Sequence, residues 1–243
     1  MVNYELFITS SPFMPGECDI TELNNMAENL RNAVPADAKA LFIPANPYDQ
    51  SFAAGQMHGM RTAMERLGIT FSRFAYLDMN NTMSAERLIR TSDIIVLGGG
   101  HLPTQNTFLK RIKMREILND MEGKMVLMGI SAGAMNLADE VYSSPEEPGE
   151  ALDPNYERFI TGLGLTTRNI MPHYNTLQGA MLDGMRLFED IIYEDSRGKE
   201  ILIFPDGTYI HTHDGKEELY GQAWLCKDAV MTPICNQGEV VEL

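Results

Sequence analysis

The sequence predicts an α/β fold: a mostly parallel sheet with helices on both faces, followed by a C-terminal β-hairpin region. Short apolar runs, such as residues 40–43 and 93–97, alternate with stretches of helical periodicity. Continuous apolar runs of this length are typical of parallel strands buried on both faces. From residue 200 onwards, short apolar runs are instead separated by Pro-Asp-Gly and Asp-Gly turns, which favours hairpins.

The expected elements follow the chain in order, each ended by glycine, proline or polar turn residues. Strands are expected at residues 6–8, 40–43, 70–77, 93–97, 124–128, 170–171, 201–204, 209–213 and 218–225. Helices are expected at residues 21–33, 52–67, 84–90, 104–119 and 182–193. Residues 139–153 are acidic and proline-rich without periodicity, so we expect a long surface loop there. No domain boundary is evident, and we expect residues 1–243 to form one domain.

The composition limits the classes of partner and compartment. The net charge of −15 disfavours nucleic acid and anionic membranes, because both require a basic surface. Three cysteines without a CxxC pair favour a reducing compartment over a disulfide framework. The N-terminus lacks a secretory pattern, and no stretch approaches the ~18 apolar residues of a membrane span. We therefore expect a cytoplasmic protein that acts as a monomer or homodimer.

One motif dominates the middle of the chain. The apolar run at 125–128 leads into Gly129-Ile130-Ser131-Ala132-Gly133, followed by small residues that suit a helix. A Gly-x-Ser-x-Gly motif between a strand and a helix indicates a nucleophile elbow, in which the serine hydroxyl is exposed at the end of the sheet. Glycine suits positions 129 and 133 because side chains there would collide with the crowded turn. The motif predicts that Ser131 is a nucleophile.

A serine nucleophile needs a base, usually a histidine held by a carboxylate. Of five histidines, His173 is the preferred candidate, because it follows the short strand at 170–171 at the end of the sheet where Ser131 should lie. A structural histidine at a strand end is the alternative. His58 falls within a surface-like helix. His211 and His213 share one face of a strand, but without a metal-binding partner motif they are better explained as exposed hairpin histidines, so we expect no metal and no cofactor.

The remaining parts of such a site are a carboxylate and donors for an oxyanion. Asp206 ends another buried strand in a Pro-Asp-Gly turn, although aspartate before glycine is also ordinary turn chemistry. Acids of the expected loop are alternatives: Glu146, Glu147 and Asp153. The Ala132 N–H at the helix start and the triglycine at 98–100 could donate to an oxyanion.

The ordered motifs resemble the peptidase E family, the serine peptidases of family S51 that include aspartyl dipeptidase and, more distantly, cyanophycinase. The resemblance rests on three segments: the triglycine at 98–100, the Ser-Ala-Gly-Ala sequence at 131–134, and Gly164-Leu165 followed by Pro172-His173-Tyr174. It implies a fold like that of class I glutamine amidotransferases. It also implies Ser131 as the nucleophile, His173 as the base and an acid at the Pro-acid-Gly turn, which is Asp206 here. The implied oxyanion donors are the backbone of Gly99 or Gly100 and of Ala132.

The chain departs from the dipeptidase in two segments that should shape the substrate pocket. The triglycine is followed by residues 101–105, His-Leu-Pro-Thr-Gln, where the dipeptidase has Asn-Thr-Phe, and the loop after the nucleophile helix differs in composition. A preference for N-terminal aspartate would require a local cation, for which Arg158 and Arg168 are candidates. We expect a serine peptidase acting on small, dipeptide-like substrates. The alternatives are an esterase or isopeptidase with the same triad, and a non-catalytic binding protein of this fold.

Overall fold

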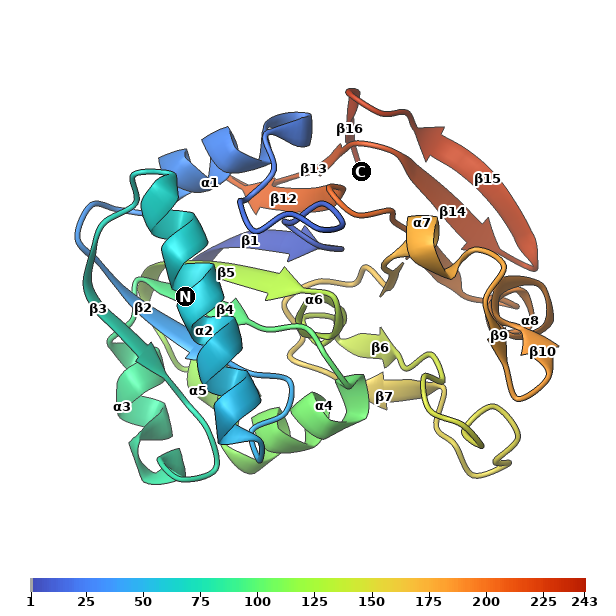
Figure 1. The fold of residues 1–243 in the computed structure, drawn as a ribbon, viewed down its shortest axis with the longest axis horizontal. Helices are drawn as coiled ribbons and strands as arrows, with labels where there is room; N and C mark the ends of the chain where they lie inside the picture. Colours follow the sequence, from blue (N-terminus) through green and yellow to red (C-terminus); the bar gives the residue numbers. More distant parts are fainter. Residues whose placement is uncertain (1) are drawn as a thin grey trace.

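The fold is built around one large twisted sheet. The computed structural model describes residues 2–243, and within them the main sheet has eight strands in the order β16-β13-β12-β1-β5-β4-β2-β3 (Figure 1). The five strands from β1 to β3 in that order are mutually parallel, and β12, β13 and β16 are antiparallel. Their bounds are β1 Val2–Thr9, β2 Ala38–Ile43, β3 Phe71–Tyr76, β4 Ile94–Leu97, β5 Gly123–Ile130, β12 Tyr209–His213, β13 Lys216–Tyr220 and β16 Val240–Glu242. The mostly parallel α/β sheet that the sequence predicts is confirmed.

Helices cover both faces of this sheet, because consecutive strand residues point to opposite sides. On one face, Phe7, Phe42 and Val96 pack with α1 (Met26–Ala33) and α2 (Gln50–Arg66). On the other face, Leu6, Leu41 and Leu97 pack with the remaining helices of this layer. Those helices are α3 (Ala85–Arg90), α4 (Leu102–Arg111), α5 (Met114–Asn119) and α6 (Ala132–Met135).

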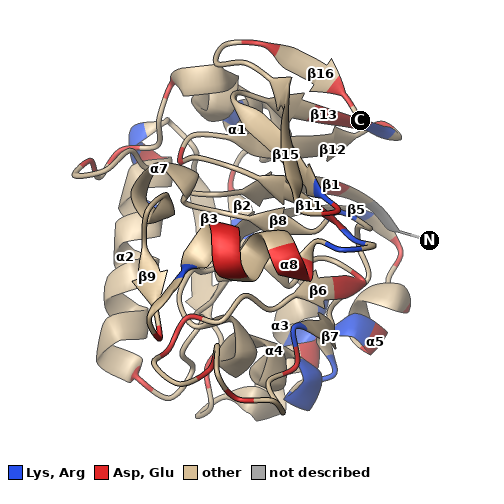
Figure 2. Ribbon diagram, turned by 90° about the vertical axis from the view of Figure 1, so that its right-hand side faces the viewer, with Lys and Arg blue, Asp and Glu red and all other residues tan. Residues whose placement is uncertain are grey.

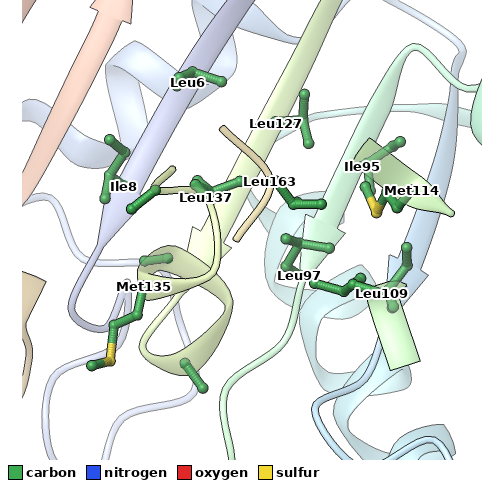
Figure 3. Close-up of a cluster of buried hydrophobic side chains, with 14 of the residues drawn as sticks. Leu6, Ile8, Ile95, Leu97, Leu109, Met114, Leu127, Met135, Leu137 and Leu163 are labelled. Atoms are coloured by element: carbon green, nitrogen blue, oxygen red, sulfur yellow. The ribbon is translucent and has the colours of Figure 1, made fainter. Parts of the chain in front are cut away.

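Figure 3 shows part of this second cluster, where side chains of β1, β5 and β4 meet Leu109, Met114 and Met135 of the covering helices. Leu127 and Ile95, at the centre of the cluster, are completely buried. This packing fixes the carboxyl ends of β4 and β5, and the triglycine and Ser131 directly follow those ends.

A smaller sheet lies beside the main one. Its order is β15-β14-β11-β8, from β8 (Ile170–Met171), β11 (Glu200–Ile203), β14 (Ala223–Lys227) and β15 (Val230–Cys235). It packs on a π-helical segment, Leu187–Ile192, that continues into α8 (Tyr193–Asp195). Strand β8 leads to His173 and β11 leads to Asp206, so this sheet positions both residues. None of the helices between residues 2 and 243 combines the length and the apolar character that a membrane span needs.

Charged side chains are spread over many elements of the surface. Acidic residues outnumber basic ones, 34 to 19. Figure 2 shows acidic residues distributed over loops, strands and α8 on one side of the molecule.

Several predicted elements are wrong in extent. The expected helix 21–33 starts only after a short 3₁₀ turn, Leu23–Asn25, with positive φ at Asn24. The expected helix 104–119 is two helices, separated where Lys113 has a φ of 54°. The expected helix 182–193 begins at Leu187, because β9 (Met181–Leu182) and β10 (Met185–Arg186) form a hairpin around Asp183-Gly184.

Other errors concern strands. The expected strand 218–225 is two strands in different sheets, and Gly221 (φ 95°) turns the chain between them. The expected loop 139–153 begins with β6 (Glu140–Tyr142), which pairs with β7 (Phe159–Thr161). The sequence prediction also lacked β15 and β16.

Candidate active site

Ser131 occupies a strained turn between β5 and α6. Its φ of 52° and ψ of −116° are conformations that non-glycine residues rarely adopt. Its N–H donates to the carbonyl oxygens of Thr9 and Ser10 at the end of β1, at 3.0 Å each, which holds the turn against the neighbouring strand. A nucleophile elbow requires a strained strand-to-helix turn of this kind.

The glycines on either side of Ser131 permit this turn. A Cβ on Gly129 would lie 2.5 Å from Ala134 Cα, and one on Gly133 would lie 2.3 Å from the carbonyl oxygen of Leu97. Both contacts are with backbone atoms, which cannot move aside without shifting the sheet or the helix. The close packing of α6 on β4 and β5 therefore requires glycine at both positions.

The structure brings Ser131, His173 and Asp206 into one hydrogen-bonded chain. Ser131 Oγ lies 2.8 Å from His173 Nε2, and His173 Nδ1 lies 2.7 Å from Asp206 Oδ1. With its proton on Nδ1, His173 donates to Asp206 and its Nε2 can accept the serine proton. The His173 side chain is 32% exposed, whereas that of Asp206 is 8% exposed, so solvent and substrate reach the base while the carboxylate is shielded.

The environment of Asp206 keeps it ionised. Burial alone would raise its pKa, but the hydrogen bond and charge of His173, with further hydrogen bonds from Ser10 and Asn175, outweigh this effect and lower the pKa. Ser10 Oγ donates to Asp206 Oδ1 at 2.9 Å and accepts the His173 N–H at 2.9 Å. The Asp206 N–H donates to Asn175 Oδ1 at 3.1 Å. The Ser10 hydroxyl thus links the Asp206 carboxylate to the backbone N–H of His173.

Free backbone donors lie beside Ser131. Within residues 2–243, the amides of Gly99, Gly100 and Ala132 donate no hydrogen bond to a protein group. A Cβ on Gly99 would lie 3.3 Å from Ser131 Cβ, so the triglycine backbone passes directly by the serine. These amides could donate to an oxyanion formed on a carbonyl that Ser131 attacks.

Two glutamines fix the direction of these donors. Gln105 Nε2 donates to the Gly98 carbonyl at 2.9 Å, and Gln56 Nε2 donates to the Gly99 carbonyl at 3.0 Å. Each carbonyl shares a planar peptide with the next N–H, so holding the oxygen also holds the Gly99 or Gly100 amide. No sequence signal singled out either glutamine, since both lie within ordinary helical stretches.

Comparison with known proteins identifies the family of this chain. The family model described as peptidase family S51 matches residues 6–220. The chain belongs to this family of serine peptidases. A comparison with curated proteins finds no match.

Two solved structures share the fold of this S51 peptidase. A peptidase from an acI-B1 Actinobacterium has a TM-score of 0.70 at 17% identity, covering 99% of this chain and 97% of its own. A putative peptidase E protein from Listeria monocytogenes EGD-e has a TM-score of 0.58 at 17% identity, covering 96% and 100%. The predicted family and peptidase fold are confirmed.

Two cavities flank the serine of the peptidase, and Gly100, Ser131 and His173 line both. The α2-side cavity has a volume of about 630 Å³ and mixed walls that include Phe42, Gln56 and Arg66. The loop-side cavity has a volume of about 450 Å³, and the segment 144–146 forms part of its wall. Both volumes are typical of sites for small ligands, ~300–1,000 Å³.

The other candidate residues lie away from Ser131. His58 is exposed on α2 at the wall of the α2-side cavity. His101 Nδ1 contacts Thr104 Oγ1 at 2.8 Å. Arg158 lies 3.7 Å from Asp195, and Arg168 pairs with Glu217 at 2.8 Å. Neither arginine lines either cavity, so the structure gives no support to the expectation that one of them supplies a local cation for an acidic substrate.

The description of His211 and His213 as exposed hairpin residues is also wrong in part. The two rings share a face, with centroids 4.3 Å apart, but His211 is only 6% exposed. It stacks on Phe7, its Nε2 bonds Glu5 at 2.9 Å, and burial lowers its pKa. His213 bonds Glu218 at 3.0 Å. Carboxylates therefore hold both rings in the sheet.

Proposed function

We propose that this S51 serine peptidase hydrolyses small, dipeptide-like substrates through Ser131, His173 and Asp206. The main observation that supports this proposal is the hydrogen-bonded chain from Ser131 Oγ through His173 to Asp206, with distances of 2.8 and 2.7 Å. Short peptides are favoured because the two cavities at Ser131 are of small-molecule size, about 630 and 450 Å³.

In the proposed reaction, Ser131 Oγ attacks the scissile carbonyl carbon while His173 Nε2 takes the hydroxyl proton. The amides of Gly99 or Gly100 and of Ala132 donate to the negative oxygen that forms, an interaction worth ~3–4 kcal/mol per donor in a related case. His173 then passes its proton to the leaving amine as the C–N bond breaks, which leaves an ester on Ser131. A water molecule, deprotonated by the same imidazole, hydrolyses this ester and restores the hydroxyl.

We further propose that the enzyme acts in a reducing compartment, the cytoplasm. All three cysteines are free: Cys18 is exposed, and Cys226 and Cys235 are buried. Burial raises the pKa of both buried thiols, which keeps them protonated and unreactive.

A fluorophosphonate probe tests the assignment of the nucleophile. Wild-type protein is expected to be labelled and to hydrolyse a dipeptide panel, and Ser131→Ala is expected to lose both properties. Ser51→Ala, which changes an exposed serine of α2, is the matched control and should behave as wild type. Equal labelling and turnover of Ser131→Ala and wild type would remove Ser131 from the mechanism.

A further inference from the structure

Most side chains that line the loop-side cavity are apolar. Met135, Met171 and Leu187 form its buried part, with exposed fractions of 3, 5 and 6%. Leu177 and Leu182 are half-buried and complete the apolar lining. A carbonyl at Ser131 would place one neighbouring side chain of the substrate against these walls, where apolar groups gain from the removal of water.

The charge in this cavity is negative. Apart from His173, Glu146 is the one charged side chain of its lining within residues 2–243, and no lysine or arginine takes part. Although much of the Glu146 residue is exposed, desolvation of its carboxyl and the charges of Glu150 and Glu147 raise its pKa to about 7. At neutral pH Glu146 is therefore ionised in only part of the molecules. Where it is ionised, a substrate carboxylate would face like charge, and where it is neutral that carboxylate would still lose its hydration with no lysine or arginine of the lining to offset the loss.

The loop that carries Glu146 is held in place from two sides. Glu150 accepts the N–H groups of Glu146 and Glu147 at 2.8 and 2.9 Å, and its other oxygen lies 3.6 Å from His101 Nε2. The carboxylate of Asp183 accepts the N–H groups of residues 149 and 151 at 2.7 and 3.1 Å. His101, which follows the triglycine, therefore lies next to Glu150 of the loop after the nucleophile helix, and Glu146 of that loop lines the cavity.

We propose that the loop-side cavity binds the side chain of the residue that supplies the scissile carbonyl, and that it selects an uncharged apolar side chain over an acidic one. The inference rests on the proposed peptidase function of Ser131. It assigns the substrate class as peptides with leucine-like residues before the cleaved bond, with aspartate disfavoured. Apolar burial favours leucine and charge repulsion disfavours aspartate, so we expect kcat/KM to differ by about 100-fold or more.

The test compares leucyl- and aspartyl-methylcoumarin amides, which share one leaving group. Met181→Arg adds a cation at the rim of the loop-side cavity, and Phe52→Arg adds one at the wall of the α2-side cavity. Both side chains are exposed, 59 and 54%, so neither change disturbs the core. Met181→Arg should raise the aspartyl-to-leucyl ratio of kcat/KM by about 10-fold or more. Phe52→Arg should leave this ratio unchanged, whatever its effect on the absolute rates.

The same ranking can be measured without following product formation, from how strongly each amide slows fluorophosphonate labelling of Ser131. A wild-type preference for the aspartyl amide would overturn the inference, as would a ratio that responds to Phe52→Arg and not to Met181→Arg. Ser131→Ala separates this failure from failure of the proposed function. If that variant still hydrolyses both amides, the function is wrong; if hydrolysis requires Ser131 and favours aspartate, only the cavity assignment is wrong.

Discussion

Asp206→Asn isolates the role of the carboxylate in the proposed triad. Asp206 Oδ1 accepts from His173 Nδ1 at 2.7 Å and from Ser10 Oγ at 2.9 Å. An asparagine can keep the Ser10 bond, but it removes the negative charge and can present an N–H to the imidazole. His173 would then carry its proton on Nε2, where it can no longer accept the proton of Ser131. The same change in a chymotrypsin-type triad lowers kcat ~10⁴-fold, or ~5 kcal/mol, and we expect a loss of this order.

The assay is kcat for a peptide substrate, together with the thermal unfolding midpoint and the rate of fluorophosphonate labelling. Asp153→Asn is the matched control, because within residues 2–243 the hydrogen bonds of Asp153 stay inside its own loop, with Gly149, Asn155 and Tyr156. It should retain wild-type kcat. Near-normal turnover of Asp206→Asn, with an unchanged unfolding midpoint, would refute the reasoning. The role would then pass to the loop acids considered from the sequence: Glu146, Glu147 or Asp153.

Two further predictions concern the support of the site. Ser10→Ala should lower kcat by at least ~10-fold and the free energy of unfolding by ~1–3 kcal/mol, because it leaves the His173 N–H without its acceptor. An unchanged kcat together with an unchanged denaturant midpoint would contradict this prediction. Gly133→Ala should destabilise the protein by ~3 kcal/mol or more in urea unfolding, since its Cβ would lie 2.3 Å from the Leu97 carbonyl oxygen. Gly55→Ala is the control, because Gly55 lies within α2 and no atom comes within 4 Å of the added Cβ. This substitution should stabilise the protein by ~0.5–1 kcal/mol. Equal effects of the two substitutions would show that the packing at Gly133 tolerates a methyl group.

The sequence predicted the parallel sheet well because each central strand is buried on both faces. Residues 94–97 are apolar without interruption, and all four are buried in β4. Such a run needs no knowledge of its partners to be recognised. The antiparallel edge was harder, because β15 and β16 are largely exposed and carry no continuous apolar run.

The errors fall where tertiary contacts decide the local conformation. At Gly221, an added Cβ would lie 2.2 Å from the side chain of Asn24, almost two hundred residues earlier. That close approach accompanies the turn that splits the expected strand 218–225 between two sheets. By contrast, the Asp183-Gly184 turn was detectable from the sequence, because Asp-Gly is a strong hairpin signal. In the structure both residues have positive φ, as such a turn requires. The helical spacing of the residues that follow obscured it.

The sequence alone predicted the α/β class, which is confirmed, and it named Ser131, His173 and Asp206 as the members of the proposed triad, because strand ends and turn glycines are encoded locally; the structure brings these three residues together. Only the tertiary structure decided which groups hold these residues and what surrounds them. Ser10 and Gln56 bond groups that lie 196 and 43 residues away in the sequence, at Asp206 and Gly99. The loop-side cavity likewise forms only where α6, β8 and the segment 144–146 converge. The residues of the proposed triad could therefore be selected from local motifs, whereas the pocket that we propose selects the substrate depends on how distant segments pack together.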